Sequence, residues 1–121
     1  MLREIILYTI IIFLLYQFIY RDNRQEVNYV LNIVRMRMLI ILKHLGLSIN
    51  FNLYPSTSGS YVENGNDIYI DVSSQNINLI TEHCLHELAH ILCIDKDHNK
   101  EYFYTYQQLL SSAIDMGFLV K

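Results

Sequence analysis

The sequence predicts a small α+β domain that follows an N-terminal transmembrane helix. Three observations predict it: an uncharged apolar stretch near the N-terminus, helical spacing of apolar residues in three later segments, and alternating apolar and polar residues after the first of those segments. The 121 residues therefore divide into a membrane anchor at residues 1–22 and one domain at residues 23–121.

The first segment carries no charge from Ile5 to Tyr20 and approaches the roughly 20 apolar residues that a bilayer requires. No small residue from Leu14 to Tyr20 supplies a cleavage site, which indicates an uncleaved anchor. The alternative is an N-terminal helix packed on the domain or on another subunit. The positive-inside rule predicts a single-pass protein with its domain on the cytoplasmic or virion-interior side, because Arg3 precedes the segment and four arginines follow it: Arg21, Arg24, Arg35 and Arg37.

An amphipathic helix is expected next, ending near Gly46. Its apolar residues recur three or four positions apart: Val27, Val30, Leu31, Val34, Met38, Ile41, Leu42 and Leu45. Residues 47–53 then alternate between apolar and polar, which predicts a half-buried strand closed by Pro55. Residues 61–63 and 67–72 flank Asn64-Gly65-Asn66, which predicts a β-hairpin.

The helix expected from Ile77 to Ile94 contains the pattern His-Glu-x-x-His at residues 86–90. His86 and His90 are one helical turn apart on one face, so both can bind the same metal ion. Glu87 lies too far around the helix to share the ligand role, but it can take a proton from a water at the metal. The surrounding residues are apolar on nearly every side, so these polar side chains need partners, which a metal supplies. A core helix with hydrogen-bonded histidines is the alternative.

Catalytic zinc usually takes three protein ligands and a water, so a third ligand is expected. His98 is favoured, because imidazole suits zinc and the polar turn after the helix can fold back toward the metal. A solvated loop histidine is the alternative reading of His98. Other ligand types lie close in the sequence: His83, Cys93, Asp95, Asp97 and Glu101.

The last helix is expected from Lys100 to Met116, before Gly117. Its apolar face is expected to contain Phe103, Tyr106, Leu109, Leu110 and Ala113. Tyr102 or Tyr104 could reach the site and stabilise an oxyanion, and the alternative for both is a packing or surface role. Cys84 and Cys93 lie about 13 Å apart along one helix, too far for a disulfide.

The run from His86 to Phe103 resembles the minimal zinc peptidases of the WLM and SprT-like group, most of all the short single-domain members of large DNA viruses. In that family two helical histidines and a third from the following loop bind zinc, and the glutamate is the general base. The resemblance assigns the zinc ligands to His86, His90 and His98, and the general base to Glu87. The resemblance covers roughly residues 67–118. It also implies that Phe103 packs on the core and that the domain at residues 23–121 is a small zincin-like domain.

The net charge of −3, without a basic cluster beyond the membrane-proximal region, gives no support for nucleic-acid binding. The predicted function is a membrane-anchored zinc metallopeptidase that hydrolyses a peptide or protein substrate, which an edge strand near the zinc would bind by strand addition. One alternative is an interaction protein with a structural zinc site, which a fourth protein ligand would favour. The other is a metal-free structural protein, which histidines hydrogen-bonded to side chains would favour.

Overall fold

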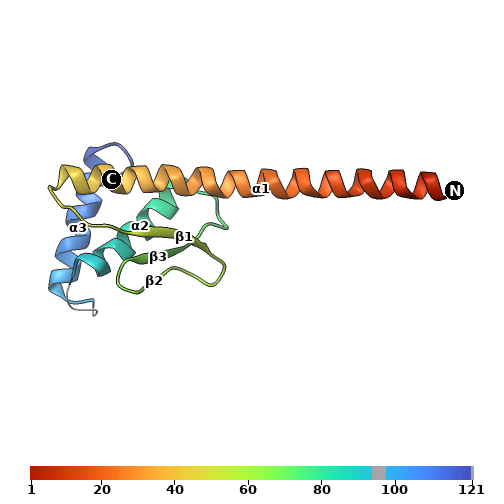
Figure 1. The fold of residues 1–121 in the computed structure, drawn as a ribbon. Coiled ribbons are helices and arrows are strands. Elements are labelled where there is room, and N and C mark those ends of the chain that lie inside the picture. The colour runs from red at the N-terminus through yellow and green to blue at the C-terminus, as the bar shows by residue number, and fades with distance from the viewer. Residues whose placement is uncertain (94–97, 121) are drawn as a thin grey trace.

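The computed structural model describes residues 1–93 and 98–120, without the side chains of residues 19–28. A long helix, α1 (Leu2–His44), lies with its C-terminal half along a small body and projects its N-terminal half away from that body (Figure 1). The body contains a mixed sheet and two helices, which confirms the predicted small α+β class. Its elements are β1 (Asn52–Ser56), β2 (Tyr61–Glu63), β3 (Asp67–Asp71), α2 (Ile77–Leu92) and α3 (Lys100–Asp115).

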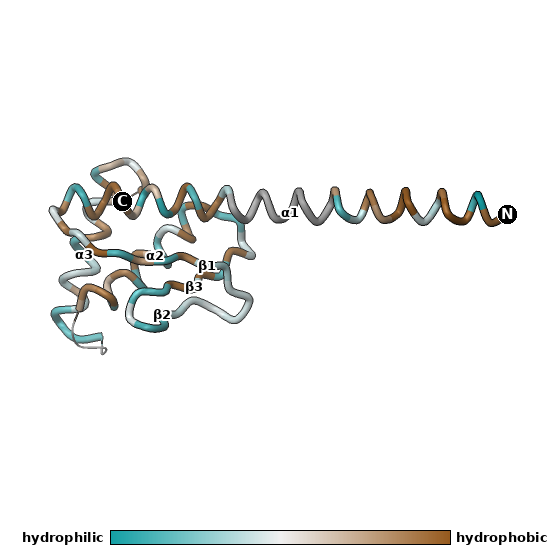
Figure 2. Tube along the Cα trace, viewed as in Figure 1, coloured by the Kyte–Doolittle hydropathy of each residue, from teal (hydrophilic) through white to brown (hydrophobic). Residues whose placement is uncertain are grey.

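The projecting half of α1 is apolar over most of its length (Figure 2) and does not pack on the domain. Its large apolar side chains from Ile5 to Phe18 are 45% to 67% exposed. Within the part of the chain whose side chains are described, no helix combines the length and apolar character needed to cross a membrane. The helix continues through residues 21–24, where the sequence suggested a boundary between the anchor and the domain. The side chains of Arg21 and Arg24 lie outside the described part.

The second half of α1 forms one side of the core, as its apolar spacing predicted. Six of the expected residues are buried: Val30, Leu31, Val34, Met38, Ile41 and Leu42. Val27 lies outside the described side chains. Gly46, at φ +70°, follows the end of the helix in the left-handed region that glycine adopts without strain. Arg37 links α1 to α2, donating to Asn78 Oδ1 at 3.0 Å and Thr81 Oγ1 at 3.2 Å.

The sheet has the order β1-β3-β2, with β1 parallel and β2 antiparallel to β3. The predicted hairpin is confirmed, and Asn64 (φ 53°) and Gly65 (φ 80°) form its turn in left-handed conformations. The strand predicted at residues 47–53 is wrong in its bounds, since β1 begins at Asn52 and continues past Pro55. Proline is tolerated there because β1 is an edge strand. The other edge is β2, on the side of the sheet away from α1 (Figure 1).

One face of the sheet packs on α2 and supplies the central core residues Leu53, Ile68 and Ile70. Leu85 and Leu88 of α2 meet them and are fully buried. The core therefore fixes α2 beside the sheet, and with it the histidines that α2 carries.

Candidate metal centre

Helix α2 positions the first two histidines. Asn76 caps its N-terminus, and the amide oxygen of Asn76 accepts from the backbone nitrogens of Asn78 and Leu79, both at 3.1 Å. Seven of the sixteen residues of the helix are buried. His86 and His90 are partly buried and lie on one face, with ring centroids 5.1 Å apart.

His98 approaches this pair from the segment before α3. Its Nε2 lies 3.0 Å from Nε2 of His90, and one ligand atom from each of the three histidines lies within 4.8 Å of the others. Two nitrogens bound to one tetrahedral zinc ion lie about 3.3 Å apart, so the spacing of this pair fits a shared ion. The three histidines therefore form a cluster that could hold a metal ion. The same contact also fits the metal-free alternative, in which the histidines are hydrogen-bonded to side chains.

The protonation of the helical histidines favours ligation. Burial is the main cause that lowers the pKa of His86, and the nearby His98 and His83 lower it further. Burial also lowers the pKa of His90, with smaller contributions from His86 and His98. A metal binds the neutral imidazole, so both rings are in the form that binding requires at neutral pH.

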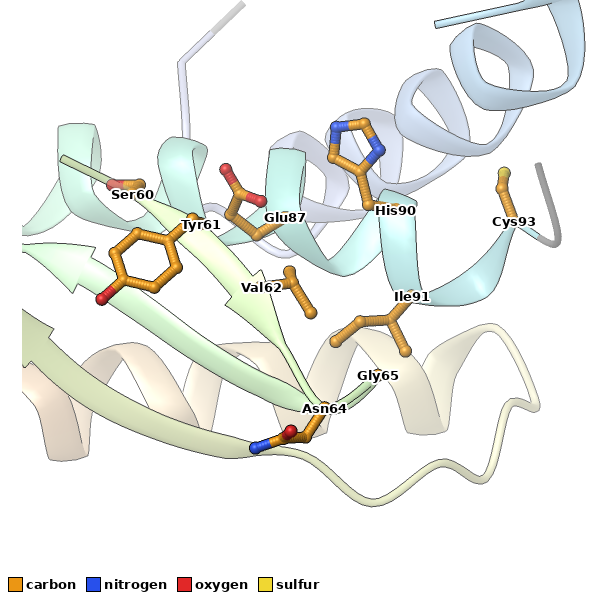
Figure 3. A pocket seen from close by; sticks show the side chains of 9 residues that line it. All are labelled: Ser60, Tyr61, Val62, Asn64, Gly65, Glu87, His90, Ile91 and Cys93. Atoms are coloured by element: carbon orange, nitrogen blue, oxygen red, sulfur yellow. The ribbon is translucent and has the colours of Figure 1, made fainter. Parts of the chain in front are cut away.

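Glu87 is the buried carboxyl group of the site, at 8% exposure. Burial raises its pKa above the ordinary value, while the nearby His98 partly opposes this shift. Figure 3 shows Glu87 and His90 projecting from the same side of α2. A carboxyl group with a raised pKa next to metal ligands is suited to accept and release a proton during a reaction.

Two clefts meet at Glu87. The larger, of about 540 Å³, lies between α2 and the edge strand β2, with Tyr61 and Val62 on the strand side and Glu87, His90 and Ile91 on the helix side (Figure 3). The other, of about 360 Å³, is also lined by Glu87, with His86, Ser60, Asp71 and His83. The edge strand β2 therefore lines the same cleft as Glu87 and His90.

The other sequence candidates do not join the cluster within the described residues. His83 is exposed and lines the smaller cleft, and Glu101 is exposed on α3. Cys93 is buried, and its thiol donates to Thr105 Oγ1 at 3.4 Å. Asp95 and Asp97 lie outside the described residues.

Helix α3 corrects one expectation about aromatic packing. Phe103 is 55% exposed, so its predicted position in the core is wrong, and the buried aromatic is Tyr102 at 1%. Tyr102 precedes Leu109 by seven residues and Ala113 by eleven, so these three buried side chains share one face of α3. Phe103 lies about 100° around the helix from Tyr102 and points outward.

Tyr102 also contacts the histidines. The sequence indicated only that Tyr102 or Tyr104 could reach the site. Its hydroxyl oxygen lies 2.8 Å from Nδ1 of His86 and donates to the His86 carbonyl oxygen at 3.2 Å. Burial is the main cause that raises the pKa of Tyr102, so the phenol stays protonated at neutral pH. Tyr104, the other candidate, is 68% exposed.

Comparison with known proteins finds no matching family model, no matching curated protein and no matching solved structure.

Proposed function

We propose that this chain is a membrane-anchored zinc metallopeptidase that hydrolyses peptide bonds. The observation that carries the proposal is the convergence of His86, His90 and His98 next to the buried Glu87, which lines a cleft bordered by an edge strand together with His90. This combination supplies metal ligands, a proton carrier and a peptide-binding strand at one place.

The ligand set suits zinc. Three neutral imidazoles are a donor set that zinc accepts, and they leave a fourth position for water or substrate. His86, His90 and His98 would hold the ion, which would acidify a water and polarise the scissile carbonyl. The proposed centre is an open catalytic site, in which the three histidines are the protein ligands and the fourth position is left to water or substrate.

Glu87 is the proposed general base. Its backbone follows that of His86, so the helix fixes the carboxyl group beside the ligands. The carboxylate would accept a proton from the attacking water and return it to the leaving amine. Cleavage thus requires that Glu87 exchange its proton near neutral pH, in keeping with its raised pKa.

The proposed substrate is an extended segment of a peptide or protein. One side of β2 pairs with β3, which leaves its other side available to a further strand. Because β2 borders the cleft that contains Glu87 and His90, a peptide added there would pass over both side chains. The two clefts that share Glu87 would take the residues that flank the scissile bond.

The proposed anchor is the projecting half of α1. A helix that is apolar all round needs an apolar environment, and its side chains from Ile5 to Phe18 find none on this domain. The polar Thr9 within it donates its hydroxyl to the Ile5 carbonyl oxygen at 2.8 Å, which reduces the cost of burying it in lipid. The apolar sequence continues to Tyr20, and the arginines that follow favour a domain on the cytoplasmic or virion-interior side.

The resemblance to WLM and SprT-like peptidases remains part of the proposal. It is supported by the order of ligands along the chain, with two histidines on α2, a third before α3, and the glutamate directly after the first. We also propose that the chain is most similar to the short, single-domain members of that group in large DNA viruses.

To test this function, the rate at which zinc-loaded wild type cleaves an unfolded protein is compared with the rate for the zinc-loaded Glu87→Gln variant. The variant should retain zinc and lose about 100- to 10,000-fold in cleavage rate, because general-base catalysis contributes about that much. Glu82→Gln is the matched control, since Glu82 lies exposed on the same helix. Equal cleavage by wild type and Glu87→Gln would contradict the proposal. Bound zinc without any cleavage would favour a structural zinc site.

A further inference from the structure

Among the described residues, Tyr102 is the one side chain whose ring contacts the rings of all three histidines in the cluster. Its centroid lies 4.5 Å from that of His90, 4.7 Å from that of His98 and 5.5 Å from that of His86. Tyr102 is buried, with 1% of its surface exposed. Tyr102 is therefore placed to influence the positions of the three imidazoles together.

The first turn of α3 fixes Tyr102 relative to His98. Asn99 is the N-cap of this helix, and its side-chain oxygen accepts from the backbone nitrogen of Tyr102 at 3.0 Å. Because Asn99 directly follows His98, the same turn sets the position of both the third histidine and the tyrosine. The tyrosine then reaches across to the first histidine on α2.

Both contacts of the Tyr102 hydroxyl with His86 can be hydrogen bonds at the same time in one arrangement of protons. A phenol has one proton to donate and can also accept. The carbonyl oxygen of His86 can only accept, so the bond at 3.2 Å uses the phenol proton. The contact at 2.8 Å with Nδ1 is then a hydrogen bond only if Nδ1 carries a proton and donates it to the phenol oxygen. In that tautomer Nε2 has the free lone pair that a metal requires.

We propose that Tyr102 is the positioning residue of the metal centre, and that its hydroxyl holds His86 in the Nδ1–H tautomer with Nε2 free to bind the metal. This inference rests on the proposed metal site and does not depend on peptidase activity. Metal-binding histidines generally donate their second nitrogen to such a partner, whose loss typically weakens metal binding. Here a buried phenol serves in place of a carboxylate or a backbone carbonyl.

The test compares the full-length protein with Tyr102→Phe, which keeps the ring and removes the hydroxyl. Nitrogen-15 NMR of the metal-free wild type should show His86 protonated on Nδ1, and Tyr102→Phe should shift it toward a mixture of tautomers. Zinc affinity, measured by chelator competition, should fall about 10- to 100-fold in the variant. Tyr106→Phe is the matched control, because the Tyr106 ring contacts His86 edge-on with centroids 5.7 Å apart. It should leave both readouts unchanged.

The outcomes separate this inference from the proposed function. His86 protonated on Nε2 in the wild type would overturn the inference, whether or not Tyr102→Phe folds. Wild-type zinc affinity in a folded Tyr102→Phe protein would also overturn it. Zinc binding and the Nδ1–H tautomer without any peptide cleavage would contradict the proposed function and leave this inference standing, whereas absence of zinc binding by the wild type would overturn both.

Discussion

The Nε2 atoms of His90 and His98 lie 3.0 Å apart, although His90 belongs to α2 and His98 precedes α3. Two neutral imidazoles can share only one hydrogen at that contact, whereas a metal ion accepts a lone pair from each. The contact therefore links two segments of the domain through groups that a metal would hold together.

Zinc is expected to stabilise the folded domain because it binds residues that only the fold brings together. At a free zinc concentration 100 times the dissociation constant, the free energy of unfolding should rise by about 2.7 kcal/mol. Chemical denaturation with zinc and with a chelator measures the difference. An identical unfolding midpoint in both conditions would contradict a specific site in the folded state.

Leu85→Ala should destabilise the domain strongly, because Leu85 is fully buried between α2 and the sheet. Removing a buried leucine side chain leaves a cavity and typically costs about 2–5 kcal/mol. Leu79→Ala on the same helix is the matched control, since Leu79 is 40% exposed, and it should cost much less. Urea denaturation of both variants measures which one loses more free energy of unfolding. A larger loss for Leu79→Ala would show that α2 packs by another face.

Asp71 should contribute stability that depends on pH. The backbone nitrogen of Ser73 donates to its carboxylate at 2.9 Å, and this bond is the main cause that lowers the pKa of Asp71 in the folded state. Stability from this bond is therefore present above the unfolded pKa of about 3.9 and is lost as the pH falls through the lower folded value. Asp71→Asn should be less stable than wild type at pH 7, with a smaller difference at pH 3. An NMR titration that gives Asp71 a raised pKa would refute the assignment.

The projecting half of α1 should carry the membrane affinity of the chain. Full-length protein is expected to sediment with lipid vesicles, and a fragment of residues 23–121 to stay in solution while still binding zinc. The fragment keeps the buried residues of α1 from Val30 onward, so its core is intact. Equal sedimentation of both proteins would assign membrane binding to the domain. Full-length protein that forms oligomers and ignores vesicles would favour packing of α1 on another subunit.

Apolar periodicity and turn residues predicted most of the fold, because both report local physics. The apolar spacing from Val30 to Leu42 gave the buried face of α1, and the Asn64-Gly65 turn gave the hairpin. The parallel pairing of β1 with β3 could not be read in this way, because it depends on contacts between segments distant in sequence. The bounds of β1 were missed since proline normally ends a strand, whereas an edge strand tolerates it.

The site was predictable to a similar extent. The spacing of His86 and His90 on one helix makes their shared face a local property, and the convergence of His98 with them agrees with its choice over His83. Tyr102 was assigned no firm role, because its contact with His86 spans sixteen residues and two helices. The choice of Phe103 as the core aromatic was wrong for a related reason. Tyr102 and Phe103 are adjacent in the sequence, and only the packing of α3 shows which of them points inward.

Metal content of the purified protein tests the central claim most directly, measured for wild type, His98→Ala and His83→Ala under one chelator challenge. His83→Ala is the matched control, because His83 lies exposed on the same helix as two of the proposed ligands and outside the cluster. The three-histidine centre predicts nearly one zinc per chain in wild type and in His83→Ala, and zinc that the chelator removes readily from His98→Ala. Folded wild-type protein without zinc, or equal retention by His98→Ala, would contradict it.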